Sequence, residues 1–410
     1  MESRNGSGGA AADIGGKIIG LDRNVFFVGL TSFLTDTTSK MVYSVMPLFL
    51  LSLGATKTQL SLIEGIAEST ASLLKAASGW FSDRMGRNKP FMVVGYAFSA
   101  LLFPLFSVAR APLDVLAIRF TERVGKGIRA APRDSLVAAS SGKGDRGRSF
   151  GFHKAMDNSG AIVGPLLAAG LLAAFPDQYR KVFLISGLPA IFGLLSLMTF
   201  VREARKPKEE RLGRLSLKDL PAKFYAFLGI ALLFTLGNST DALLLVKASD
   251  VGIANSYIPM MYLVFNSVSV LFSVPAGILS DRIGREKLII FGYLLYSVVY
   301  FLFGRTGSPA GVVLLFALYG LYSASTDGIQ KALVTDISGS KTKGTCLGIY
   351  NFIVGITLLP ASLIAGILYD KAGGGAPFYF GSAMAFAAAV LMIAFYVAGR
   401  RHGRAAHPAE

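Results

Sequence analysis

Long apolar stretches recur along this chain of 410 residues, and they limit its possible folds more than any other feature. An α-helix that crosses a bilayer needs about 20 consecutive, mainly apolar residues. Most of the connections between the stretches are too short to hold a domain. The sequence therefore predicts an all-α integral membrane protein with twelve transmembrane helices, at about 24–52, 58–81, 90–110, 113–139, 149–175, 182–201, 223–249, 254–280, 288–305, 309–337, 343–369 and 376–399.

The composition agrees with a protein that sits in a lipid bilayer. Hydrophobic residues make up 52% of the chain and charged residues only 16%, which is too little polar surface to cover a large soluble core. The net charge of +16 would suggest a nucleic-acid partner in a soluble protein, but here we expect none. The single cysteine, Cys346, excludes an internal disulfide and a multi-cysteine metal site. We expect no metal and no cofactor.

A charged linker at 202–222 divides the predicted helices into two groups of six. The expected organisation is a flexible tail at 1–23, an N-terminal six-helix bundle at 24–201, the linker, a C-terminal six-helix bundle at 223–399 and a second tail at 400–410. Basic residues outside the spans favour one side of the membrane, with 25 on the side of the tails and linker and 7 on the other. Because basic loops stay in the cytoplasm, we expect a plasma (inner) membrane protein with both termini cytoplasmic.

An eleven-residue motif occurs twice, once after the second helix of each predicted bundle. The segments 79–89 and 277–287 both read G-x-x-S-D-R-x-G-R-x-K, at an offset of 198 residues. Their carboxylates can pair with nearby arginines, and their inner glycines permit a tight turn. Such contacts can be made in one conformation and broken in another, so we expect gating loops; a purely structural role for these charges is the alternative. The candidate gating residues are Gly79, Asp83, Arg84, Gly86, Arg87, Gly277, Asp281, Arg282, Gly284 and Arg285.

With this repeat, the sequence resembles the major facilitator superfamily over 24–399, and within it bacterial drug:proton antiporters. Arg123 and Gly127 are similar to the R-x-x-x-G motif of the family's fourth helix. Gly160, Gly164 and Pro165 are similar to the G-x-x-x-G-P motif associated with antiporters, where the glycines also let a neighbouring helix approach closely. The resemblance implies two bundles related by a pseudo-twofold axis, a rocker-switch mechanism, and a cavity lined by the first, fourth, seventh and tenth helices.

Eighteen charged residues lie inside the predicted spans, where a charge is costly unless it is paired or wet. Nine are basic and nine are acidic: Lys40, Lys75, Arg119, Arg123, Lys126, Arg129, Arg133, Lys154 and Lys331, against Asp36, Glu64, Glu68, Glu122, Asp134, Asp157, Asp241, Asp327 and Asp336. The charges of the fourth helix fall within an arc of roughly 120° at about 100° per residue, so this face must line a cavity or pair with other helices. Helical spacing also predicts pairs of Asp36 with Lys40, Asp327 with Lys331, and Asn238 with Asp241.

Two interpretations of these charges remain open. In the first, Arg123 and Lys126 hold an anionic group of the substrate, and a carboxylate such as Asp36, Glu122, Asp241 or Asp327 carries a coupling proton. In the second, the charges are fixed ion pairs that hold the helices in register; this is favoured for Lys75, Arg133, Asp134 and Asp336, near the helix ends. The candidate substrate and coupling residues are Asp36, Lys40, Arg119, Glu122, Arg123, Lys126, Asn238, Asp241, Asp327 and Lys331.

The predicted function is secondary active transport by alternating access, as proton-coupled export of a small organic compound, with some preference for substrates that carry negative charge. The alternatives are a proton-coupled uptake symporter or an organic-anion exchanger, and a non-transporting sensor or lipid scramblase on the same scaffold. We expect no enzyme: the G-x-S-x-G match at 147–151 opens a membrane helix instead of a strand-to-helix turn, and the chain has no Walker A loop. The expected partners are the lipid bilayer, a small-molecule substrate and a proton, and we expect a monomer.

Overall fold

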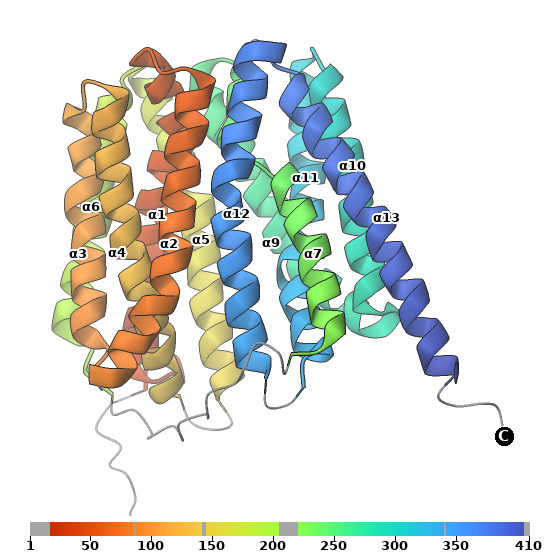
Figure 1. Ribbon diagram of the computed structural model, residues 1–410. Helices are drawn as coiled ribbons and strands as arrows, with labels where there is room; N and C mark the ends of the chain where they lie inside the picture. The colour runs from red at the N-terminus through yellow and green to blue at the C-terminus, as the bar shows by residue number, and fades with distance from the viewer. Residues whose placement is uncertain (1–16, 86, 142–144, 205–219, 340–341, 406–410) are drawn as a thin grey trace, which may run out of the picture.

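The computed structural model shows two helical bundles side by side (Figure 1). It describes residues 17–85, 87–141, 145–204, 220–339 and 342–405. The N half contains α1–α6 and the C half contains α7–α13. Helices are the expected solution in a bilayer, because a helix satisfies its own backbone hydrogen bonds where water is absent.

The helices alternate in direction through the membrane. Their bounds are α1 Arg23–Ser52, α2 Lys57–Met85, α3 Lys89–Leu105, α4 Pro112–Ala139, α5 Arg146–Ala174, α6 Tyr179–Phe200, α7 Ala222–Gly237, α8 Ala242–Asp250, α9 Ile258–Ile283, α10 Arg285–Arg305, α11 Pro309–Ile337, α12 Lys343–Ala372 and α13 Ala376–Ala405, with short 3₁₀ turns η1 at Phe106–Val108 and η3 at Asn255–Tyr257. The N half and C half are joined at the end where α6 stops and α7 starts, which we call the linker end. The opposite end is the distal end.

The seventh predicted span is confirmed as one apolar segment, Ala222–Asp250, but the expectation that it forms a single helix was wrong, because α7 and α8 are separate helices. Asn238 ends α7 with φ −92° and ψ 81°, and α8 begins only after Asp241. The pairing of Asn238 with Asp241 at helical spacing was therefore wrong as well. The break falls in a run of polar residues, and the hydroxyl of Thr240 accepts a hydrogen bond from the backbone of Ala242 at 3.2 Å. Ser, Thr, Asn and Asp side chains compete in this way with the helical bonds of the backbone.

Nine segments of the described chain are long and apolar enough to cross a membrane, counting α7 with α8 and η3 with α9 as one each. The other three membrane helices are α1, α2 and α4, which are equally long but carry most of the charged residues of the N half. Those charges point inward: Arg119, Glu122 and Arg123 of α4 are all buried. The polar helices are thus shielded from lipid by their apolar neighbours, as intramembrane charges require.

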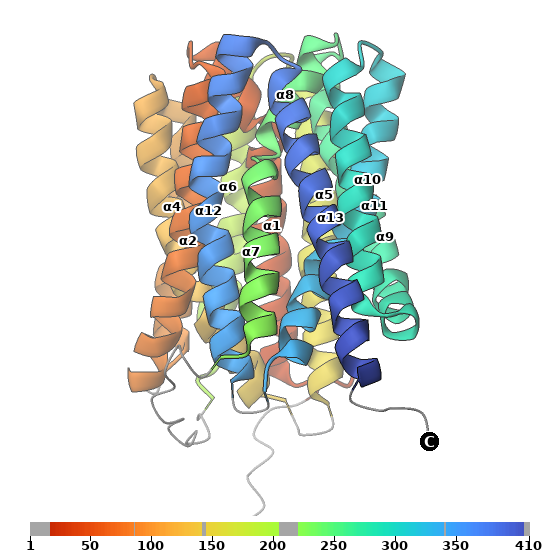
Figure 2. The same cartoon turned by 45° about the vertical axis from the view of Figure 1, so that its right-hand side comes forward.

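Glycines hold the two halves together along the contact of α2 with α12, which lie side by side in both views (Figures 1 and 2). A Cβ atom at Gly65 of α2 would lie 3.0 Å from the Cβ of Ser362, and one at Gly366 of α12 would lie 2.8 Å from the Cα of Thr58. The hydroxyl of Ser69 donates to the carbonyl of Gly355 at 2.8 Å across the same contact. Small residues let membrane helices approach this closely and gain dispersion energy.

Candidate functional site

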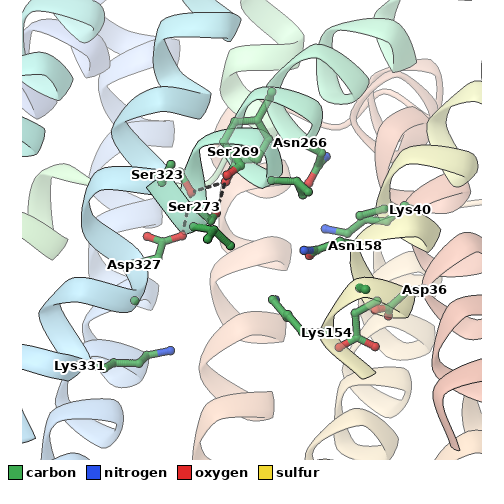
Figure 3. Close-up of a pocket in the computed structure, with 18 of the residues that line it drawn as sticks. Asp36, Lys40, Lys154, Asn158, Asn266, Ser269, Ser273, Ser323, Asp327 and Lys331 are labelled. Carbon is green, nitrogen blue, oxygen red and sulfur yellow. Dashed lines mark hydrogen bonds between the residues drawn. The ribbon is translucent and has the colours of Figure 1, made fainter. Parts of the chain in front are cut away.

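A polar cavity of about 1360 Å³ lies between the two halves. Its walls come from α1, α2, α4 and α5 of the N half and from α9 and α11 of the C half. Figure 3 shows Asp36, Lys40 and Lys154 on one wall and Asp327 and Lys331 on the facing wall. The lining extends from these residues to the exposed Asp281 at the linker end, so the cavity opens there.

Most of the predicted substrate and coupling residues line this space. Asp36, Lys40, Lys126, Asp241, Asp327 and Lys331 line the cavity itself. A smaller inner chamber of about 360 Å³ shares several of these residues and adds Arg119, Arg123 and Asn238. Glu122 lines neither space and is fully buried. The structure therefore brings nine of the ten candidates to one site, with the tenth directly behind it.

Two arginines of α4 are bound to two glutamates of α2. Arg119 reaches Glu64 with its Nε at 3.1 Å and its Nη2 at 2.5 Å, and Arg123 bonds to Glu68. The carboxylate of Glu122 lies 3.7 Å from a nitrogen of each arginine. Such charge-assisted bonds are strong when they are shielded from water. In this conformation Arg123 is consequently engaged by the protein and does not present a free guanidinium to the cavity.

Tyr43 of α1 covers the same pair of arginines. Its ring centroid lies 3.7 Å from the guanidinium carbon of Arg119 and 4.7 Å from that of Arg123. Its hydroxyl donates to Glu122 at 3.4 Å. Stacking of a guanidinium on an aromatic face adds to the ion pairs. The result is a closed network that ties α1, α2 and α4 into one rigid wall.

The remaining charges of α4 point in different directions, although they share one face of the helix. Arg129 turns to α3, where its Nη1 donates to the carbonyl of Gly95 at 3.0 Å and to the hydroxyl of Ser99 at 2.5 Å. Arg133 bonds to Asp134 at 3.0 Å, and Lys75 lies 3.8 Å from the same carboxylate. Ion pairing near the linker end thus agrees with the interpretation that favoured fixed pairs there.

Lys40 connects the two halves in the middle of the site. Its Nζ donates to the hydroxyl of Tyr262 of α9 at 3.0 Å and lies 4.9 Å from the centroid of that ring. The predicted pairs of Asp36 with Lys40 and of Asp327 with Lys331 are not formed within 4.0 Å in the described part of the chain, and Asp327 instead accepts from the hydroxyl of Ser323 at 2.8 Å. Asp241 accepts from the hydroxyl of Tyr319 at 2.7 Å. A neutral donor leaves each carboxylate free to change partners when a substrate arrives.

Sequence reasoning missed that α5 and α9 contribute residues to the lining of the cavity. Lys154, Asp157 and Asn158 of α5 line the cavity, as do Asn266 and other polar residues of α9. Figure 3 shows Asn158 beside Lys40 and Asn266 above the opening between the walls. A signal for α9 was present in the sequence, because its polar residues recur at helical spacing from 266 through 269, 273 and 280.

The second copy of the loop motif pairs within the C half. Arg285 lies 3.5 Å from Asp281, one turn earlier, and 2.5 Å from Asp336 of α11. Gly284 joins α9 to α10 with φ +100°, a conformation that only glycine adopts readily. Arg282 is exposed, and Gly277 lines the cavity. In the first copy Arg87 is exposed, whereas Gly86 and the side chains of Asp83 and Arg84, with the neighbouring Gly79, lie outside the part that the structure describes.

At the distal end the two halves are bonded to each other by a contact that we call the distal latch. One oxygen of Asp370 on α12 accepts from the backbone of Lys57 at 3.2 Å. The other accepts from the backbone and the hydroxyl of Thr58 at 2.8 and 2.6 Å. The carboxylate therefore caps α2 of the N half, where free backbone N–H groups and the helix dipole favour an anion. At the same end of the molecule, Asn255 of η3 donates to Asp177 at 3.0 Å, which also joins the two halves.

The glycines of the antiporter-like motif pack α5 on α1 beside the cavity. A Cβ at Gly160 would lie 2.6 Å from the carbonyl oxygen of Phe33 and 3.0 Å from the Cβ of Asp36. One at Gly164 would lie 2.5 Å from the carbonyl oxygen of Thr37 and 2.8 Å from the Cβ of Lys40. Both contacts are too close for any larger side chain. Pro165 follows and is buried in the same helix.

Relatives of known sequence support a transporter. The profile of the Major Facilitator Superfamily matches residues 28–240 and 226–410. An uncharacterized MFS-type transporter of Methanocaldococcus jannaschii is 34% identical over 91% of this chain and 95% of its own length. A multi-drug resistance efflux pump of Streptococcus pneumoniae is 23% identical over 71% of this chain and 75% of its own length.

Solved structures show the same fold at low sequence identity. A POT family transporter in complex with a thioalcohol-conjugated peptide has a TM-score of 0.77 at 13% identity, covering 94% of this chain and 97% of that one. A bacterial homologue of the human lysosomal transporter Spinster, in an inward-facing and occupied conformation, has a TM-score of 0.70 at 15% identity, covering 92% and 96%. With two six-helix bundles, a polar cavity between them and these relatives, the chain belongs to the major facilitator superfamily and is a membrane transporter.

Proposed function

We propose that this protein is a secondary active transporter that exports a small organic compound in exchange for protons by alternating access. The observation that carries the proposal is the cavity between the halves, which opens at the linker end and is closed at the distal end by the latch of Asp370 on α2. Opening the distal end requires that latch to break, and closing the linker end requires the two bundles to rock together. One site would then face each side of the membrane in turn.

The orientation follows from the distribution of basic residues. The tails, the linker and the loops of the linker end carry 25 of the 41 basic residues, and the distal loops carry 7. We therefore place the linker end and both termini in the cytoplasm, in the plasma (inner) membrane. The described conformation is then open to the cytoplasm. Export is supported by relatives named as multidrug resistance proteins and efflux pumps, among them one of Serratia proteamaculans that is 27% identical over 78% of this chain.

The charges of the cavity suit a substrate with an acidic group. Lys126, Lys154 and Lys331 line the cavity, and their ammonium groups have no carboxylate within 4.0 Å in the described part of the chain. Because Arg123 is already bound to Glu68, these lysines are better placed than the arginine to receive an anion. Carboxylates also line the cavity, and such a group can release or take up a proton as the local charge changes.

Transport by the purified protein in proteoliposomes tests the proposal. The probes are carboxyfluorescein, an organic anion, and ethidium, an organic cation, with pyranine inside the vesicles to report protons. We expect probe flux against protons that depends on an imposed pH gradient, and loss of that dependence in Asp36→Asn, which removes a carboxylate of the cavity wall. The matched control is Asp114→Asn, which changes an exposed carboxylate at the distal end. Flux in the same direction as protons would indicate a symporter, and flux that ignores the gradient would refute proton coupling.

A further inference from the structure

A second carboxylate faces the cavity next to Asp36, on the neighbouring helix. Asp157 of α5 lies one turn before Gly160, the residue whose backbone packs on Phe33 and Asp36 of α1. Both carboxylates line the same cavity. The close helix contact made by the antiporter-like motif therefore brings two acids of like charge to one place on the N-half wall.

Asp157 is only partly satisfied by its protein neighbours. Its Oδ2 lies 3.7 Å from the Nδ1 of His153 and 3.9 Å from the Nη1 of Arg133, which are electrostatic contacts longer than hydrogen bonds. Its Oδ1 is buried, and the described residues offer it no hydrogen-bond partner. An ionised carboxylate that is left in this state costs more than a neutral one, because a buried charge needs donors. The described residues thus leave one oxygen of Asp157 available to carry a proton.

Behind Asp157, a chain of hydrogen bonds runs into the N half. The Nε2 of His153 lies 2.9 Å from the hydroxyl of Ser32, which lies 3.2 Å from the hydroxyl of Tyr96 on α3. His153 and Ser32 are both buried. A hydroxyl can donate or accept, so the imidazole can adopt either neutral tautomer without losing this contact. His153 can therefore turn either an N–H donor or a lone pair toward Asp157.

Cationic side chains surround Asp36 and Asp157 and offset part of their negative charge. The groups that face this pair are Lys40 of α1, Tyr96 of α3, Lys126, Arg133 and Asp134 of α4, His153 and Lys154 of α5, and Tyr262 of α9, which binds Lys40. When both carboxylates are ionised they repel each other, and when both are neutral the surrounding cations are left without counterions. A state with one proton between two acids avoids both costs.

We propose that Asp36 and Asp157 hold one exchangeable proton between them on the N-half wall of the cavity, with His153 and Ser32 positioning Asp157 from behind. This inference deepens the proposed function, because it names the proton-binding site that coupled export requires. The proton would leave from a carboxyl O–H to cavity water and return to the same oxygen from water. A substrate that changes the charge beside the pair then changes its proton occupancy, and the reverse holds by linkage.

Infrared difference spectroscopy of the purified protein tests the proposal without any substrate. We expect a C=O stretch of a protonated carboxyl group that shifts in D₂O and disappears as the pH is raised. Both Asp36→Asn and Asp157→Asn should remove this band, whereas Asp241→Asn and Asp327→Asn should leave it in place. A band that survives in Asp157→Asn would overturn the shared site.

A swap variant separates the position of the carboxylate from the mere presence of one. Asp157→Asn combined with Asn158→Asp keeps the composition and moves the carboxylate by about 100° around α5. We expect this swap to lack the band while retaining the helical circular dichroism and thermal unfolding of the unchanged protein; a band of full size in the swap would refute the geometry. The infrared and transport measurements test different claims. Flux that ignores a pH gradient in a protein with the titrating band would refute the proposed function, while gradient-driven flux in a protein without the band would refute only this inference.

Discussion

The distal latch predicts a measurable shift between two conformations of the transporter. Asp370 of α12 caps the first turn of α2 through both of its oxygens, at 3.2 Å to the backbone of Lys57 and 2.8 Å to that of Thr58. Asp370→Asn keeps the size of the side chain but loses the charge and one of the two acceptor oxygens. In the proposed mechanism, this contact joins the two halves at the end that must open during transport. Weakening it should therefore favour the conformation that is open at the distal end.

The size of the shift follows from the bonds that are lost. One hydrogen bond is worth about 0.5–1.5 kcal/mol net. Because Asp370 is exposed to solvent, water screens its charge, and the charge adds little to the energy of these hydrogen bonds. A loss of about 1 kcal/mol in Asp370→Asn corresponds to a change of about fivefold in the ratio of the two conformations. Asp370→Ala removes the whole cap, worth up to about 2 kcal/mol, and should change the ratio by up to about 30-fold.

Distances between spin labels report this ratio directly. The single native cysteine, Cys346, is buried and would be replaced by alanine. One label pair, at Val108 and Gly307, spans the distal end; a second, at Gly147 and Gly344, spans the linker end at the start of the fifth helix of each half. In double electron–electron resonance, Asp370→Asn should increase the share of molecules with a longer distance between the distal labels and a shorter distance between the linker-end labels.

The matched control is Asp114→Asn at the same end of the molecule. Asp114 also accepts two backbone hydrogen bonds, from Arg110 at 2.8 Å and Ala111 at 3.0 Å, but both belong to the N half. Its loss should leave both label distances unchanged. Unchanged distances in Asp370→Asn and Asp370→Ala, or an equal shift in Asp114→Asn, would show that the latch does not control the equilibrium.

Two further predictions concern the walls of the site. Gly160→Val should lower the melting temperature in a thermal unfolding assay and abolish transport, because the new side chain would collide with the backbone of Phe33. The control is Gly170→Val, which has open space around it and should melt like the unchanged protein. Arg119→Gln leaves Glu64 buried without its guanidinium and should cost about 3–5 kcal/mol of stability; a melting temperature equal to that of the unchanged protein would contradict a stabilising role for the pair.

The membrane topology could be predicted from sequence because it depends on a property that is local. Each span is a run of apolar residues. Eleven of the twelve predicted spans contain one α-helix each, which in the third and eighth spans adjoins a 3₁₀ turn, η1 or η3. The seventh does not, because a hydropathy window averages over the polar residues 238–241 that separate α7 from α8. The run from Gly237 to Asp241 contains no apolar side chain, and that signal could have located the break.

The site was harder to predict because partners on different helices depend on how those helices are rotated and packed. One face of α4 carries a row of cations, which periodicity revealed. The structure divides that row between α2, which binds Arg119 and Arg123, and α3, which binds Arg129. A clue was available, since Glu64 and Glu68 have the same four-residue spacing as the two arginines. Spacing alone does not fix which two helices are neighbours, and so it left the pairing open.

The placement of the ion pairs and hydrogen bonds between the halves agrees with a cavity that is open at only one end. In the described part of the chain, charged side chains at the linker end pair within a half, as Arg285 does with Asp336. At the distal end Asp370 pairs across the halves. Rocking of rigid bundles cannot keep both ends closed, so contacts made at one end are given up at the other. If the loop motif is a gate, Arg285 or Asp281 must therefore exchange its partner for one on the N half when the linker end closes. The energy of that new contact has to match the roughly 1–2 kcal/mol lost from the latch, or the transporter would rest in one conformation and turn over slowly.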